Sequence, residues 1–110
     1  MHATLRIAVF VVVFVPVAAN AATAGNAADG ERYAKAHCAE CHTVDKSGEI
    51  SPDFAAPRFV DVANTPGMTE RAIAVWLQTS HPTMPDLMIP EPVRDSLIAY
   101  IMSLKSLPQQ

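Results

Sequence analysis

The pentapeptide Cys38-Ala39-Glu40-Cys41-His42 constrains the fold of this chain more than any other feature. It contains both cysteines of the 110 residues, spaced as Cys-x-x-Cys, and a histidine follows the second one directly. Side chains three positions apart on a helical turn point in roughly the same direction, so both thiols can reach one edge of a porphyrin. The histidine can then ligate the iron from one face of the ring. This spacing is typical of the covalent attachment site of a c-type haem.

Three other interpretations of the cysteines compete with haem attachment. A thioredoxin-like redox pair accompanies a βαβ pattern, and we predict no strands here. A zinc site needs a second Cys or His pair at a suitable spacing, which the chain lacks. A plain disulfide in an exported protein is the simplest alternative. The adjacent His42 and the absence of a third cysteine favour haem over all three.

The N-terminal segment has the pattern of an export signal. Arg6 provides the positive charge, a nearly unbroken apolar run covers residues 7–19, and small residues follow. We expect cleavage after Ala19, Ala21 or Ala24. The run is shorter than the roughly 20 apolar residues of a spanning helix. An uncleaved anchor is therefore the less favoured alternative, and no membrane span is expected once the signal is removed.

The expected domain organisation is a signal peptide followed by one small domain. We assign residues 1–24 to the signal, 25–28 to a flexible leader, 29–106 to the domain and 107–110 to a tail. A mature chain of about 85 residues buries only a modest apolar core. Short helices packed around a large apolar cofactor would compensate, so we expect the chain without haem to be poorly folded.

The charge of the mature chain excludes some classes of partner. The full sequence carries 8 Lys and Arg against 11 Asp and Glu, a net charge of −3. Arg6 leaves with the signal, so the mature charge is −4. No basic cluster exists, which argues against nucleic acid or an anionic membrane surface as a partner. An acidic protein would be steered toward a neutral or basic docking face.

Three principal helices and one short helix are predicted, which makes the chain all-α. The principal helices cover residues 29–37, 69–79 and 92–104, and the short one follows Pro57. Asp29 and Thr69 are the predicted N-caps, and Pro92 is the predicted first residue of the last helix. Apolar residues form a continuous stripe on that helix: Val93, Leu97, Tyr100, Ile101 and Leu104.

Three segments, in this order, support a family resemblance. They are the Cys38–His42 pentapeptide after a first helix, His81-Pro82-Thr83-Met84-Pro85 in a late loop, and Leu97-Ile98-Ala99-Tyr100-Ile101 in the closing helix. With them the chain resembles small bacterial class I c-type cytochromes over its whole mature part. The resemblance implies a cytochrome c-like fold, in which the first and last helices cross at Gly30, Tyr33 and Tyr100.

A second axial ligand would make the iron a dedicated electron carrier. The candidates are Met68, Met84, Met88, Met102, His37 and His81. Met84 is preferred because it lies in a loop beside Pro85, which stiffens the backbone, and because it matches the Met-Pro ligand of the family. Met88 is the second choice. His81 would serve if both axial ligands were histidines.

The resemblance also implies residues that support the iron ligand and the haem pocket. A backbone carbonyl should accept a hydrogen bond from the second ring nitrogen of His42. We expect that of Pro57, with Pro52 as the alternative. Phe59, Trp76 and Leu77 are candidates for the pocket wall. A plain core tryptophan is an equally good interpretation of Trp76.

These residues together predict a periplasmic one-electron carrier with a single haem c. The resemblance implies redox partner proteins, such as a dehydrogenase or a terminal oxidase or reductase, a monomeric state and no catalysis by the chain itself. Two alternatives stay open. The chain could be the haem-c subunit of a larger oxidoreductase, or a five-coordinate haem protein with ligand-binding or peroxidatic activity.

Overall fold

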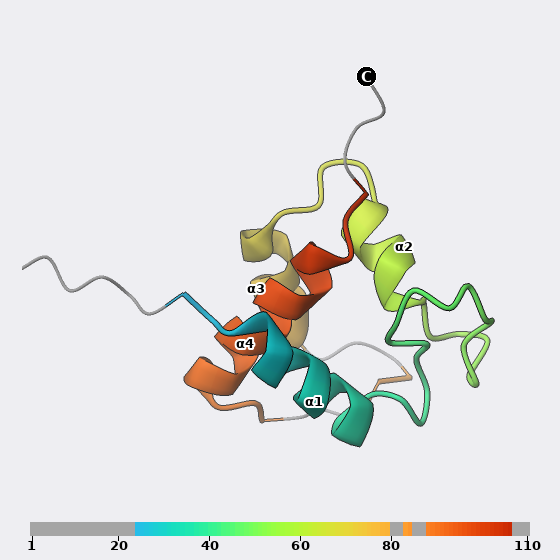
Figure 1. Cartoon of the computed structure of the whole chain (residues 1–110), viewed down its shortest axis with the longest axis horizontal. Helices are drawn as coiled ribbons and strands as arrows, with labels where there is room; N and C mark the ends of the chain where they lie inside the picture. The colour runs from blue at the N-terminus through green and yellow to red at the C-terminus, as the bar shows by residue number, and fades with distance from the viewer. Residues whose placement is uncertain (1–23, 80–82, 85–87, 107–110) are drawn as a thin grey trace, which may run out of the picture.

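The computed structural model describes residues 24–79, 83–84 and 88–106, and that part of the chain is all-helical without strands, as predicted (Figure 1). Its four helices are α1 (Ala27–His37), α2 (Phe59–Asn64), α3 (Glu70–Gln78) and α4 (Glu91–Ser103). Residues 1–23 of the expected signal, residues 80–82 and 85–87 and the tail at 107–110 lie outside the described residues. None of the helices in the described ranges is long and apolar enough to cross a membrane.

Helix α1 begins two residues earlier than predicted, and Asn26 rather than Asp29 is its N-cap. The Asn26 side chain accepts hydrogen bonds from the backbone N–H groups of Ala28 at 2.9 Å and Asp29 at 3.4 Å. The backbone N–H of Asn26 donates to Ser96 Oγ at 3.2 Å. The segment expected to be a flexible leader therefore includes the start of α1 and contacts α4.

The first and last helices cross at Gly30, where the family resemblance placed the crossing. A Cβ atom at Gly30 would lie 2.0 Å from the carbonyl oxygen of Ser96 and 2.8 Å from Tyr100 Cβ. Figure 1 shows α1 and α4 lying against each other at the centre of the molecule. Tyr33, one turn further along α1, stacks its ring on that of His37, with the centroids 4.4 Å apart. At position 30, only glycine permits the close approach of the α1 backbone to α4.

Helix α2 is the short helix predicted after Pro57, but it starts later than Pro57 itself. Arg58 is the N-cap and Phe59 the first helical residue, so Pro57 precedes the helix rather than opening it. Phe59 and Ala63 are buried, and Val62 packs against the core. The three side chains are spaced i, i+3, i+4, so they share one face of the helix.

Helix α3 has the predicted cap, and Trp76 lies outside its buried face. Thr69 Oγ1 accepts from the backbone N–H of Ala72 at 3.1 Å, which confirms Thr69 as N-cap. Ile73 is buried and Leu77 is partly buried against the core. Trp76 is 57% exposed, so the interpretation as a core tryptophan is wrong.

Helix α4 supplies more of the described core than any other helix and packs against the other three helices. It starts at Glu91, which makes Pro92 its second residue rather than its first. Of the predicted stripe, all but Val93 are buried, and Ile98 joins them. After the helix, Lys105 Nζ donates to the carbonyl oxygen of Met68 at 3.2 Å, which ties the end of α4 to the start of α3.

Candidate functional site

The Cys38–His42 segment forms a tight turn that continues directly from α1. Cys38 is the C-cap, and its backbone N–H donates to Ala34 O at 2.8 Å. The N–H groups of Cys41 and His42 both donate to the carbonyl oxygen of Cys38, at 3.1 and 2.9 Å. Cys38 is buried, whereas Cys41 and His42 are half-buried. Both cysteines are free, so two thiols and one imidazole share this turn.

The Cys38 thiol has an environment unlike that of a reactive redox cysteine. Burial, with a smaller contribution from Cys41, raises the pKa of Cys38 to about 11. Catalytic cysteines in Cys-x-x-Cys redox proteins instead have lowered pKa values. The raised pKa therefore disfavours the thioredoxin-like interpretation.

The His42 ring is oriented by the carbonyl group that the family resemblance implied. His42 Nδ1 lies 2.7 Å from the carbonyl oxygen of Pro57. A carbonyl oxygen can only accept, so Nδ1 carries the proton, and in the neutral ring the lone pair is therefore on Nε2. The ring of Phe59 lies beside the His42 ring, with the centroids 5.3 Å apart and the two planes tilted by 55°. His42 thus has one nitrogen committed to the protein and the other available for a metal ion.

The backbone that follows His42 is held by hydrogen bonds that the sequence did not predict. Thr43 N–H donates to Ser51 Oγ at 3.0 Å, and Thr43 O accepts from the N–H of Phe59 at 2.9 Å. The Tyr100 hydroxyl donates to Val44 O at 2.8 Å. Partners eight to 56 positions apart leave no periodic signal in a sequence. These hydrogen bonds hold the backbone of Thr43 and Val44, which directly follow the candidate iron ligand His42.

The structure places Met84 in the loop between α3 and α4, half-buried. Its neighbour Thr83 has a φ of 84°, a backbone conformation that β-branched residues rarely adopt. Such outliers cluster at functional sites. Met88, the second choice, is 91% exposed, whereas Met68 and Met102 pack against the core. His81 and Pro85 lie outside the described residues.

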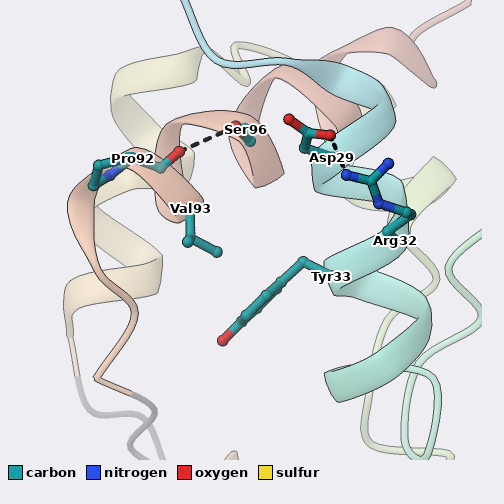
Figure 2. A pocket seen from close by; sticks show the side chains of 6 residues that line it. All are labelled: Asp29, Arg32, Tyr33, Pro92, Val93 and Ser96. Carbon is teal, nitrogen blue, oxygen red and sulfur yellow. Dashed lines mark hydrogen bonds and ion pairs between the residues drawn. The ribbon is translucent and has the colours of Figure 1, made fainter.

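An open hollow of about 480 Å³ lies between α1 and α4, but it is not the predicted site. Figure 2 shows the Tyr33 and Val93 side chains projecting into it, with Asp29 and Arg32 paired at its rim. Ser96 Oγ there donates to the carbonyl oxygen of Pro92 at 3.0 Å. None of the residues predicted to hold a cofactor lines this hollow.

The chemistry of the donor set suits a covalently held haem. Two free thiols in one turn match the two thioether bonds of haem c. The oriented Nε2 of His42 matches the need for a neutral imidazole ligand. The Pro57 carbonyl matches the outer-shell partner that ligating histidines almost always have.

Comparison with known proteins identifies the family. Cytochrome c-552 of Bradyrhizobium diazoefficiens is 32% identical to this chain over 105 residues, which cover 96% of the chain and 99% of that protein. No protein-family profile matches the sequence. No solved structure matches it either. With full-length similarity to a cytochrome c, an all-helical fold and the Cys-x-x-Cys-His turn, this chain belongs to the small c-type cytochromes.

Proposed function

We propose that this protein is an exported one-electron carrier that holds a single haem c through Cys38 and Cys41. The observation that carries the proposal is the oriented His42 ring, whose Nδ1 lies 2.7 Å from Pro57 O, on the same turn as two free thiols. Bound haem c supplies a one-electron couple between Fe(III) and Fe(II). Everything else required of the site is supplied by the polypeptide.

Each site residue has a distinct role in this proposal. Cys38 and Cys41 anchor the cofactor, and His42 ligates the iron through Nε2. Pro57 O holds the His42 ring in one orientation and increases its basicity. Phe59 packs on the imidazole. Met84 supplies the second axial ligand, and its sulfur raises the reduction potential relative to a second histidine.

The exposed face of α3 completes the pocket in this proposal. Trp76 and Leu77 are neighbours on α3, the helix that precedes the Met84 loop. Trp76 is more than half exposed although it is the largest apolar side chain of the helix. A tryptophan with this exposure has surface to offer a flat apolar ligand. Trp76 and Leu77 therefore form the wall on the Met84 side.

The proposed iron ligands favour a carrier role over catalysis. If His42 and Met84 both held the iron, they would leave no coordination position for peroxide or a gas, and the haem would supply one-electron chemistry alone. The acidic mature chain would be steered to a basic docking face of a dehydrogenase or of a terminal oxidase or reductase. The export pattern at residues 1–24 supports an exchange in the periplasm. We propose that the protein acts there as a monomer.

Mass spectrometry and absorption spectroscopy of the exported protein test the proposal. We expect the mass of a chain that begins after Ala19, Ala21 or Ala24 plus one haem, and a low-spin c-type spectrum on reduction. A Cys38→Ser/Cys41→Ser double variant should lose the covalent haem. A colourless product with the bare polypeptide mass would refute the assignment. Carbon monoxide binding by the reduced protein at neutral pH would favour the five-coordinate alternative, and stable co-purification with an enzyme would favour the subunit alternative.

A further inference from the structure

Ser51 is a polar residue that the structure buries, although it lies in an otherwise exposed loop. Its side chain is 5% exposed, while residues 45–50 on one side and Pro52 on the other are all exposed. Burial of a hydroxyl is unfavourable unless it forms a hydrogen bond. Ser51 Oγ accepts one from the backbone N–H of Thr43 at 3.0 Å. The loop therefore turns this one polar side chain inward, onto the residue that follows His42.

The Ser51 contact belongs to a set that surrounds His42. The carbonyl oxygen of Cys41, on the N-terminal side of His42, accepts from Asp53 N–H at 3.1 Å. Thr43, on the C-terminal side, bonds to Ser51 through its N–H and to Phe59 through its carbonyl group. The ring itself bonds to Pro57. One loop thus contacts His42 through its side chain and holds the backbone on both of its sides.

We propose that Ser51 is a positioning residue for His42, acting through the Thr43 peptide. The proposal rests on the function proposed above, because it requires His42 to be the iron ligand. Ser51 fixes the peptide plane that joins His42 to Thr43, and that plane sets where the His42 Cα stands relative to Pro57 O. Without the hydroxyl, the Thr43 N–H has no acceptor, and the ring loses the backbone restraint that keeps Nδ1 at hydrogen-bonding distance from Pro57.

Ser47 offers a matched control within the same loop. Its hydroxyl also accepts from a backbone N–H, that of Glu49 at 3.3 Å, but Ser47 is exposed and its partner is exposed too. Ser47→Ala therefore makes the same chemical change in the same loop without touching Thr43. Ala28→Gly, in the first turn of α1, serves as a second control, because its exposed side chain lies in a helix outside residues 41–59 that carries none of the residues assigned to the haem pocket.

The experiment compares Ser51→Ala, Ser51→Thr and the two controls as holoproteins. The rate of amide hydrogen exchange in the reduced protein reports directly on the Thr43 N–H, and the midpoint potential reports on the state of the His42 imidazole. For Ser51→Ala we expect Thr43 exchange to rise at least about tenfold and the potential to increase, because a weaker bond to Pro57 lowers the basicity of the ligand. Ser51→Thr keeps the hydroxyl and should restore both values toward the parent.

Three outcomes would overturn the inference. Unchanged Thr43 exchange in Ser51→Ala would show that the hydrogen bond is not restraining the peptide. Faster exchange with an unchanged potential would leave Ser51 a purely structural residue. An equal shift of potential in Ala28→Gly would trace the effect to general destabilisation. Failure of the proposed function looks different, because the parent protein would then carry no covalent haem at all.

Discussion

The Tyr100 hydroxyl donates a hydrogen bond to the carbonyl oxygen of Val44 at 2.8 Å, joining the last helix to the segment just after His42. Both residues are buried, so water cannot replace either partner. A buried carbonyl group without a hydrogen-bond donor lowers the free energy of unfolding. Removing the Tyr100 hydroxyl therefore measures how much the last helix stabilises the segment after His42.

We expect Tyr100→Phe to destabilise the holoprotein by about 1–3 kcal/mol, because Val44 O is left without its donor while the ring still fills its place. Guanidinium denaturation followed by far-UV circular dichroism measures the change. Tyr33→Phe is the matched control, since the half-buried Tyr33 projects into the open hollow of Figure 2. Equal losses in the two variants would contradict the special role of Tyr100.

The same tyrosine predicts a loss of stability at alkaline pH. Burial, and next the nearby charge of Glu31, raise the pKa of Tyr100 above its ordinary value of 10.0. Its neutral form is therefore favoured in the folded state. The corresponding contribution to stability is complete below pH 10 and is lost as the pH rises through the raised pKa.

Denaturation curves from pH 8 to 12 would measure this dependence. The fall above pH 10 should be shallower in Tyr100→Phe than in the parent. It should not vanish, because burial also raises the pKa of Tyr33. A variant that loses stability as steeply as the parent would show that Tyr100 titrates alike in the folded and unfolded chains.

Gly30→Ala should separate α1 from α4. The added Cβ would lie 2.0 Å from Ser96 O, which belongs to helix backbone and cannot rotate away. We expect a loss of about 2 kcal/mol or more in thermal or guanidinium unfolding. Gly48→Ala has no atom within 4 Å of its new Cβ and meets only the strain of φ +81°, worth about 1 kcal/mol. A cost at Gly30 no greater than at Gly48 would argue against the tight crossing.

Met84→Ala and Met88→Ala distinguish the two candidates for the second axial ligand. Met84→Ala should open the iron to carbon monoxide in the reduced protein at neutral pH and lower the reduction potential. Met88→Ala removes a side chain that is 91% exposed and should leave the spectrum unchanged. Absorption spectra under carbon monoxide give the comparison. The reverse pattern would transfer the ligand assignment to Met88.

Asn26→Ala tests the observed start of α1. Removing the acceptor of the Ala28 and Asp29 N–H groups should cost about 1 kcal/mol in unfolding free energy. Asp29→Ala should cost less, because Asp29 contributes only helix-dipole and exposed ion-pair energy with Arg32. A larger loss for Asp29→Ala would restore the cap that the sequence suggested.

Local chemistry explains which helix ends could be predicted from the sequence. Thr69 stands directly before a clear apolar period, so its capping role could be read from the residues alone. Asn26 lies in an alanine-rich stretch without such a period. Its side-chain bonds to the Ala28 and Asp29 N–H groups, and its backbone bond to Ser96, show in the structure that α1 starts there. The Pro57 contact with His42 was expected from family resemblance, not from periodicity.

Trp76 and Ser51 show what a sequence pattern leaves undetermined. Helical spacing places Trp76 near Ile73 and Leu77, but periodicity does not fix how wide the buried face is, and Trp76 falls at its exposed edge. Ser51 lies in a loop, where no period exists at all. Its burial depends on where Thr43 is placed by the fold, so only the three-dimensional arrangement reveals it.

The hydrogen bond from Phe59 N–H to Thr43 O joins the two ends of the loop between these residues. Residues 45–50 lie entirely at the surface beyond that closure. Doubling the length of a flexible loop costs only about 0.6 kcal/mol once its ends are joined. Insertions and deletions between positions 45 and 50 should therefore be tolerated during evolution, while residues 51–59 are held to a constant length by their bonds to the motif.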